Sequence, residues 1–216
     1  MDYPLVSALM PTFNRRAFLP RALECFLSQD YPNLELIILD DGTEQIEDLL
    51  PADPRIKYFH ETPKKHHGEK MNRCFELAQG EFCIVVDDDD WYPTDRITRQ
   101  ITPLTQNPAL HLSGTSTLYY YQHGTQQAYR YTTPKGVGWL ASIAIRKSFW
   151  KNNKFDNLQN GADYTFQNKM PPTAKYDLND PTLVVAAIHS QNACRKHLGN
   201  NYKSEPWETI QNLWQK

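Results

Sequence analysis

Four consecutive aspartates, Asp87 to Asp90, directly follow the apolar run 82–86. Neighbouring carboxylates repel one another, and at the end of a buried strand they are costly unless a cation offsets them. Oxygen-rich sites suit Mg²⁺ or Mn²⁺, and Mg²⁺ is usually held by one or two carboxylates together with substrate phosphates. The run therefore predicts a divalent cation that assists a leaving diphosphate as a Lewis acid. The alternative is a solvated acidic turn that caps the helix expected from about Thr94.

Two further polar clusters also follow apolar runs. Pro11 to Arg15 come after the run 5–10, and Asp40 to Thr43 come after the run 34–39. Parallel sheets bind ligands at the carboxyl ends of their strands. We therefore expect the three clusters to converge on one edge of a sheet.

The elements that must position these clusters alternate along the first 90 residues, which is typical of an α/β domain with a largely parallel sheet. Thr43 is placed to cap a short acidic helix that runs through Leu50. The periodicity of apolar residues predicts strands at 5–10, 34–39, 56–60 and 82–86, and helices at 16–29 and 68–78.

The second half has a different pattern. It predicts a helix at 94–106, two strands at 110–121 and 126–132 joined near His123 and Gly124, and a last strand at 182–188 before a polar tail. Five tyrosines make the hairpin aromatic. They could stack against sugar faces or simply pack across the strands, and the sequence leaves both interpretations open.

Length and composition place limits on the function. A chain of 216 residues with 40% hydrophobic and 22% charged residues predicts one folded domain over 1–216. A net charge of -2 gives no strong nucleic-acid signal. Because there is neither a signal-peptide pattern nor a transmembrane segment of roughly 18 apolar residues, we expect a cytoplasmic protein, with peripheral attachment to a membrane left open. The oligomeric state is not predicted.

The four cysteines are scattered, without a Cys-x-x-Cys pair. This spacing favours small buried residues with free thiols over a zinc or disulfide role. The cysteines are Cys25, Cys74, Cys83 and Cys194.

Several spaced motifs together resemble the family 2 glycosyltransferases of the GT-A fold. They are the segments 6–15, 29–43, 68–72 and 78–82, followed by the DxD-type motif at 87–90. The resemblance implies an α/β GT-A fold, a single Rossmann-like domain with a mostly parallel central sheet flanked by helices and a smaller acceptor-side β region. It divides the chain into a nucleotide-sugar-binding half at 1–93, an acceptor-binding half at 94–190 and a polar tail at 191–216.

The resemblance also implies roles in binding the nucleotide-sugar donor. Phe13 would stack on the base, Asp41 would hydrogen-bond the base edge, and Lys70 would lie near the pyrophosphate. Either Asp87 or Asp88 would face the ribose or the sugar, and Asp89 would contact the metal, Mn²⁺ or Mg²⁺. The implied donor-binding residues are Pro11, Thr12, Phe13, Asn14, Arg15, Asp41, Lys70, Asp87 and Asp88.

An inverting transfer needs a carboxylate on the far side of the sugar from the leaving nucleotide, to take the acceptor proton. The family commonly carries Glu-Asp before the acceptor-side helix, with the Asp as general base. Here Ala162 replaces that Glu and Asp163 is kept, so Asp163 is the predicted base. The alternative is a carboxylate that only stabilises the helix N-terminus.

Residues near the C-terminus could complete the site. In the family a histidine after the last strand can bind the metal, and His189 is the candidate, with Asn192 close by. Arg195, Lys196, His197 and Gly199 would form a lid over the diphosphate or a solvated basic tail. A second basic cluster, 64–67, is either a solvated loop or a phosphate contact.

The predicted function is therefore an inverting transfer of a sugar from a nucleotide-sugar, expected to be UDP-linked, to an acceptor hydroxyl. The acceptor could be a glycan, a lipid-linked saccharide, a protein or a modified base. A non-catalytic nucleotide-sugar or glycan binding module is one alternative. A nucleotidyltransferase is another, although the segment 11–15 lacks the glycine-rich phosphate loop expected of that class.

Overall fold

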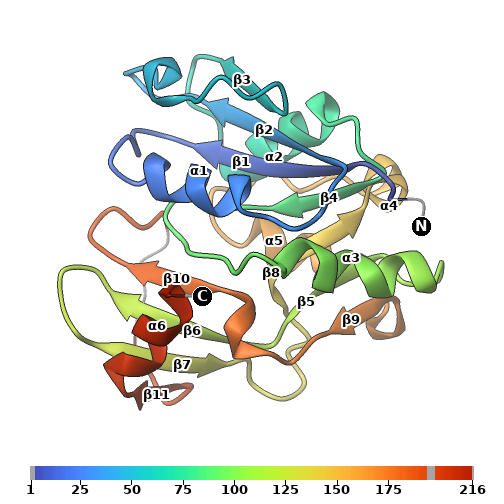
Figure 1. Ribbon diagram of the computed structural model, residues 1–216. Helices are drawn as coiled ribbons and strands as arrows, with labels where there is room; N and C mark the ends of the chain where they lie inside the picture. The colour runs from blue at the N-terminus through green and yellow to red at the C-terminus, as the bar shows by residue number, and fades with distance from the viewer. Residues whose placement is uncertain (1–2, 194–197, 216) are drawn as a thin grey trace.

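The computed structural model describes residues 3–193 and 198–215, which form two sheets with helices around them (Figure 1). The main sheet has the strand order β3-β2-β1-β4-β8-β5-β9. Its members are β1 Val6–Thr12, β2 Leu34–Asp40, β3 Ile56–His60, β4 Phe82–Val85, β5 Leu112–Thr115, β8 Ala141–Arg146 and β9 Lys175–Asp177.

The four strands of the first half pair in parallel, as the alternating pattern predicted. The second half adds β8 antiparallel to β4, with β5 antiparallel to β8. The carboxyl ends of β1, β2 and β4 consequently lie at one edge of the sheet, where the three predicted polar clusters begin.

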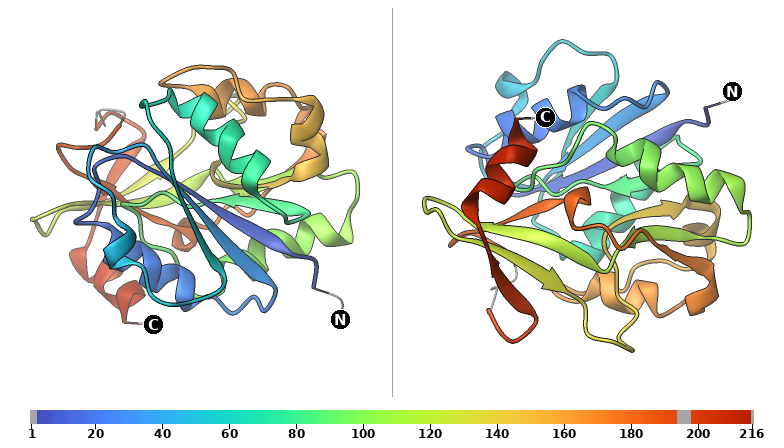
Figure 2. Two further views of the ribbon diagram at one scale, coloured as in Figure 1. Left: turned by 90° about the horizontal axis from the view of Figure 1, so that it is seen from above. Right: turned by 60° about the horizontal axis from the view of Figure 1, so that its bottom comes forward.

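Side chains that alternate along β1 fill two hydrophobic layers. Ala8 and Met10 belong to the layer beneath helices α1 and α3, whereas Leu9 belongs to the layer beneath α2, α4 and α5. Figure 2 shows these helices on the two faces of the sheet. They are α1 Leu19–Leu27, α2 His67–Leu77, α3 Arg96–Gln106, α4 Lys147–Asn152 and α5 Ala162–Gln167.

The second sheet has the order β10-β6-β7-β11. Residues 198–215 are not a plain polar tail, because they contain β11 and the helix α6, whose Ile210 is fully buried. Apolar residues at 207, 210 and 214 are spaced for one helical face, which predicts such a helix. The members are β6 Thr117–Gln122, β7 Ala128–Thr132, β10 Val185–Ile188 and β11 Tyr202–Glu205, with α6 Trp207–Trp214.

Two local expectations differ from the structure. The strand expected at 110–121 is split into β5 and β6, which lie in different sheets. The helix expected from Thr43 is a single 3-10 turn, Glu47–Leu49, with Ile46 at its N-cap. Thr43 does not cap it, because its Oγ1 instead donates to Asn14 Oδ1 at 3.2 Å. Two more such turns are Pro172–Ala174 and Pro181–Leu183.

Cys25, Cys74 and Cys83 are buried and free, as predicted, whereas Cys194 lies outside the described residues. Burial raises the pKa of the Cys74 thiol to about 12, so this group stays protonated. Within 3–193 and 198–215, the helices are all too short or too polar to cross a membrane.

Candidate functional site

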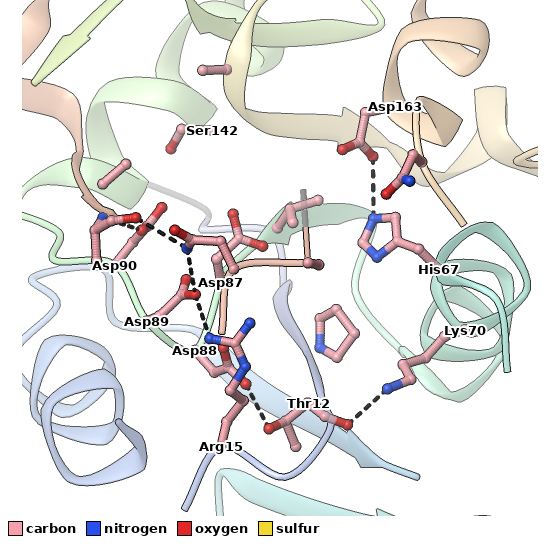
Figure 3. Close-up of a pocket in the computed structure, with 18 of the residues that line it drawn as sticks. Thr12, Arg15, His67, Lys70, Asp87, Asp88, Asp89, Asp90, Ser142 and Asp163 are labelled. Carbon is pink, nitrogen blue, oxygen red and sulfur yellow. Dashed lines mark hydrogen bonds and ion pairs between the residues drawn. The ribbon is translucent and has the colours of Figure 1, made fainter. Parts of the chain in front are cut away.

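A cavity of about 580 Å³ opens at the carboxyl ends of β1 and β4 (Figure 3). Residues from distant parts of the chain line it. They include the end of β1 and the loop after it, the start of α2, the acidic run after β4, part of β8 and the start of α5. Asp41 and His189 are outside this lining, but they contact the lining residues Lys70 and Asp89. The predicted residues in the lining are Pro11, Thr12, Phe13, Asn14, Arg15, Lys70, Asp87, Asp88, Asp89 and Asp163.

Asp41 is buried and holds the floor of the cavity together. Its carboxylate forms an ion pair with Lys70 and accepts a hydrogen bond from the Lys65 backbone N–H at 2.8 Å. Lys70 Nζ also donates to the Thr12 carbonyl at 2.7 Å. Lys70 is therefore fixed beside the β1 loop, where its charge faces the cavity. A base contact by Asp41 stays a prediction, because chain atoms already engage both of its oxygens.

Phe13 lies in the cavity wall, and its stacking on a base stays a prediction. The Lys64 ammonium lies 3.8 Å from the centroid of its ring, within the range of a cation–π contact. The basic cluster at 64–67 therefore reaches the cavity through Lys64, Lys65 and His67, while His66 is exposed.

The aspartates of the acidic run differ in burial and in their hydrogen-bond partners. Asp87 is exposed to the cavity, whereas Asp88 is buried and accepts a hydrogen bond from Thr12 Oγ1 at 2.6 Å. Burial and the neighbouring Asp89 charge raise the pKa of Asp88 to about 7. Asp90 is also buried, and it accepts from the Ala187 backbone N–H at 2.9 Å, so it joins the run to β10.

Asp89 is the centre of a compact polar cluster. Its Oδ2 accepts from Arg15 Nη1 at 2.8 Å and lies 2.9 Å from His189 Nε2. Arg15 Nη1 and His189 Nε2 are 3.1 Å apart. Burial raises the pKa of Asp89, but His189 and Arg15 outweigh it and hold that pKa below its usual value. Asn192 Oδ1 accepts from the His189 backbone N–H at 2.8 Å and so fixes this segment.

Asp163 lies across the cavity from the acidic run (Figure 3). It is the second residue of α5, and 41% of its side chain is exposed. Its Oδ1 is enclosed without a hydrogen-bond partner, and His67 Nε2 is 3.6 Å away. The predicted base thus faces the predicted metal and donor residues over open space.

The chain is similar to known glycosyltransferases. Residues 7–170 match the family described as "Glycosyl transferase family 2". The chain belongs to glycosyl transferase family 2. An uncharacterised glycosyltransferase of Haemophilus influenzae is 28% identical over 182 residues, which is 77% of this chain and 71% of that protein. The putative colanic acid biosynthesis glycosyl transferase WcaA of Escherichia coli is 40% identical over 100 residues, 44% of this chain and 36% of WcaA.

A third relative is the GalNAc(5)-diNAcBac-PP-undecaprenol beta-1,3-glucosyltransferase of Campylobacter jejuni. It is 36% identical over 93 residues, which cover 40% of this chain and 30% of that protein. The chain thus spans about a third of the E. coli and Campylobacter proteins. The glycosyltransferase prediction is confirmed at the level of the family.

Two solved structures confirm the predicted GT-A fold. The mannosyltransferase PcManGT of Pyrobaculum calidifontis, in complex with GDP-Man and Mn²⁺, has a TM-score of 0.71 at 15% identity and covers 89% of this chain and 59% of its own. Staphylococcus aureus TarS 1-349, in complex with UDP-GlcNAc, has a TM-score of 0.70 at 17% identity, with coverages of 91% and 60%.

Some residues of the cavity were not predicted from the sequence. Ser142 lines the cavity with a φ of 53°, and its Oγ is enclosed without a partner among the described residues. A left-handed serine has no readable sequence pattern. His67 was predicted only as part of the basic cluster. Of the predicted lid, Arg195, Lys196 and His197 lie outside the described residues, and Gly199 is exposed.

Proposed function

We propose that this chain transfers a sugar from a UDP-linked nucleotide-sugar to an acceptor hydroxyl, with inversion at the anomeric carbon. The observation that carries the proposal is the cavity with the acidic run on one wall and Asp163 on the other. An inverting transfer needs this separation, because the acceptor attacks from the side opposite the leaving diphosphate. We assign donor binding to residues 1–93 and acceptor binding to 94–190.

Asp89 and His189 would hold the divalent cation, Mn²⁺ or Mg²⁺. They present a carboxylate oxygen and an imidazole nitrogen 2.9 Å apart. Within the described residues, no three His, Cys, Asp or Glu side chains are grouped as a metal site. The other ligands would therefore come from the diphosphate, as is usual for Mg²⁺. When bound, the cation supplies Lewis-acid assistance to the leaving group.

Arg15 occupies the space beside these two ligands. Its Nη1 lies 2.8 Å from Asp89 Oδ2 and 3.1 Å from His189 Nε2. The guanidinium would have to turn away from Asp89 and His189 to admit a cation, and from the cavity wall it would then face the diphosphate. Lys70, fixed beside the same loop, adds a second positive charge.

Asp163 takes the acceptor proton. The new bond forms between the acceptor oxygen and the anomeric carbon while the bond from that carbon to the diphosphate breaks. The electron pair leaves with the diphosphate, and the proton moves from the acceptor hydroxyl to the carboxylate. The exposed part of the Asp163 side chain is open to an acceptor on this wall.

The acceptor class to examine first is a lipid-linked saccharide, because the Campylobacter relative is named as a glucosyltransferase for a saccharide linked to undecaprenol through a diphosphate. A glycan, a protein and a modified base are the further acceptors. For the donor, the TarS and PcManGT structures hold UDP-GlcNAc and GDP-Man, so both nucleotide classes belong in the screen.

The decisive experiment combines binding and turnover with UDP- and GDP-sugars in the presence of Mn²⁺. Wild type is expected to bind a UDP-sugar and release UDP. Asp89→Asn should lose metal and donor binding together, whereas Asp163→Asn should keep donor binding and lose turnover by at least about 100-fold. Asp95→Asn removes an exposed carboxylate outside the cavity and is the control.

Two results would contradict the proposal. Donor binding by wild type without transfer to any acceptor or hydrolysis indicates a non-catalytic binding module. Full turnover by Asp163→Asn shows that another group takes the proton.

A further inference from the structure

His67 and Asp163 face each other although they lie on separate helices. His67 is the first residue of α2, and its Nε2 is 3.6 Å from the enclosed Oδ1 of Asp163. Figure 3 shows the second carboxylate oxygen directed away from the imidazole and toward the cavity. Each oxygen of Asp163 therefore has a different environment, one facing a histidine and one facing the space for substrate.

Backbone contacts between α2 and the segment before α5 keep these two side chains close together. Gly68 lies so close to the segment before α5 that a Cβ atom there would be 1.9 Å from the Asp156 carbonyl oxygen. The Gly68 N–H donates to the Leu158 carbonyl at 3.0 Å. Further along α2, Asn72 exchanges two hydrogen bonds of 2.9 Å with the backbone of Phe155. The start of α2 is thus docked against the segment that leads into Asp163.

The charges around His67 favour its protonated form. Burial lowers the pKa of His67, but the carboxylates of Asp163 on α5 and Asp87 after β4 outweigh both burial and the charge of Lys70 on its own helix. The net effect raises the pKa of His67 above its usual value. A protonated imidazole can donate a charge-assisted hydrogen bond to Asp163.

We propose that His67 is the positioning residue of the base: it donates to Asp163 Oδ1 and so directs the other oxygen at the acceptor hydroxyl. The inference rests on the proposed function. The separation of 3.6 Å is longer than a hydrogen bond, and such contacts commonly tighten when substrate binds. His67 keeps its own proton throughout, because the acceptor proton goes to the oxygen of Asp163 that faces the cavity.

The pairing can be tested without any substrate. In protein labelled at histidine, NMR titration gives the pKa of His67 in wild type and in Asp163→Asn. We expect this pKa to fall in Asp163→Asn, because the neighbouring negative charge is lost. Glu69→Gln removes an exposed carboxylate on the same helix and should change it less. If Asp163→Asn leaves the titration of His67 where it is in wild type, the two side chains are not paired.

The role in transfer is tested with His67→Gln and with His66→Gln, its exposed neighbour, as the matched control. His67→Gln should lower kcat by about tenfold or more while UDP binds as in wild type. The pH–rate profile of His67→Gln should differ from that of wild type, because the variant lacks the imidazole that titrates beside the base. His66→Gln should match wild type in all three measurements.

Failure of the inference differs from failure of the proposed function. An unchanged kcat in His67→Gln overturns the positioning role, and a loss of UDP binding in that variant makes His67 a diphosphate contact instead. If Asp163→Asn keeps full turnover, the assignment of the base is wrong, whatever the NMR titration shows.

Discussion

At the scale of single residues, the acidic run contains groups with different tasks. Asp90 is buried and accepts the backbone N–H of Ala187, whereas Asp87 is exposed at the cavity. Neighbouring aspartates therefore have different roles: Asp90 holds the backbone and Asp87 is open to the cavity. This is possible because consecutive side chains leave the chain in different directions. The sequence alone does not reveal this difference, because all four residues of the run are aspartates.

The pair Asp90→Ala and Asp87→Ala tests the division. Asp90→Ala leaves the buried Ala187 N–H without its partner and should lower the free energy of unfolding by about 1–3 kcal/mol. Asp87→Ala, at an exposed position, should change it by less than about 0.5 kcal/mol. Urea denaturation measures both, and equal effects in the two variants would contradict the structural role of Asp90.

His67 predicts a pH dependence of stability. Its pKa is raised in the folded protein above the model-peptide value of 6.5. Its contribution to stability is therefore fully present below pH 6.5 and is lost as the pH rises through the higher folded pKa. The stability advantage of wild type over His67→Gln should shrink as the pH rises above 6.5, as measured by urea denaturation. An advantage that grows with pH would contradict the raised pKa, and His66→Gln is the control variant.

At the scale of elements, α2 links the donor and acceptor walls of the cavity. It carries Lys70 toward the β1 loop and His67 toward Asp163. Asn72 and Gly68 fasten it to the segment 155–158. The position of this one helix therefore sets both the charge beside the donor and the surroundings of the base.

Gly68→Ala should disturb this helix. The added Cβ would meet the Asp156 carbonyl oxygen at 1.9 Å, so the backbone has to move, at a cost of about 1–3 kcal/mol in the free energy of unfolding. Because the start of α2 shifts, turnover should fall as well. Gly199→Ala is the control for the stability measurement, since no heavy atom lies within 4 Å of its added Cβ. Thermal denaturation and UDP release measure the two effects, and wild-type behaviour of Gly68→Ala would contradict the docking.

At the scale of the whole molecule, α6 joins the second sheet to the first half of the chain (Figure 2). Arg21 of α1 has its guanidinium carbon 4.3 Å from the centroid of the Trp214 ring and 5.4 Å from that of Tyr121. Its Nη1 also donates to the Tyr121 hydroxyl at 3.1 Å. Arg21 thereby joins α1 to both α6 and β6 of the second sheet.

A double-mutant cycle on Arg21→Ala and Trp214→Ala should give a coupling energy of about 1 kcal/mol, the usual size of a partly desolvated cation–π contact. Urea denaturation of the two single variants and the double variant measures it. Arg130 pairs with Glu205 on the outer strand, so the cycle of Arg130→Ala with Trp214→Ala is expected to be additive. Additive behaviour of Arg21 and Trp214 would mean that the contact contributes nothing.

The sequence alone determined the parallel half of the main sheet, because buried strands and amphipathic helices have patterns set by local geometry. It also placed the polar clusters at strand ends, and its motifs indicated the family. The resemblance of the chain to the family also indicated Asp163 as the candidate base. These features depend on residues that are close together in the chain.

Only the tertiary structure decided which distant groups meet. The segment 110–121 is split into β5 and β6 because its two parts pair with strands of different sheets: β5 pairs with β8 and β9, and β6 pairs with β7 and β10. His67 approaches Asp163, which lies 96 positions further along the chain. Arg15 approaches His189, which lies 174 positions further along. Such contacts depend on how whole elements pack, and packing is a property of the complete fold that no local pattern contains.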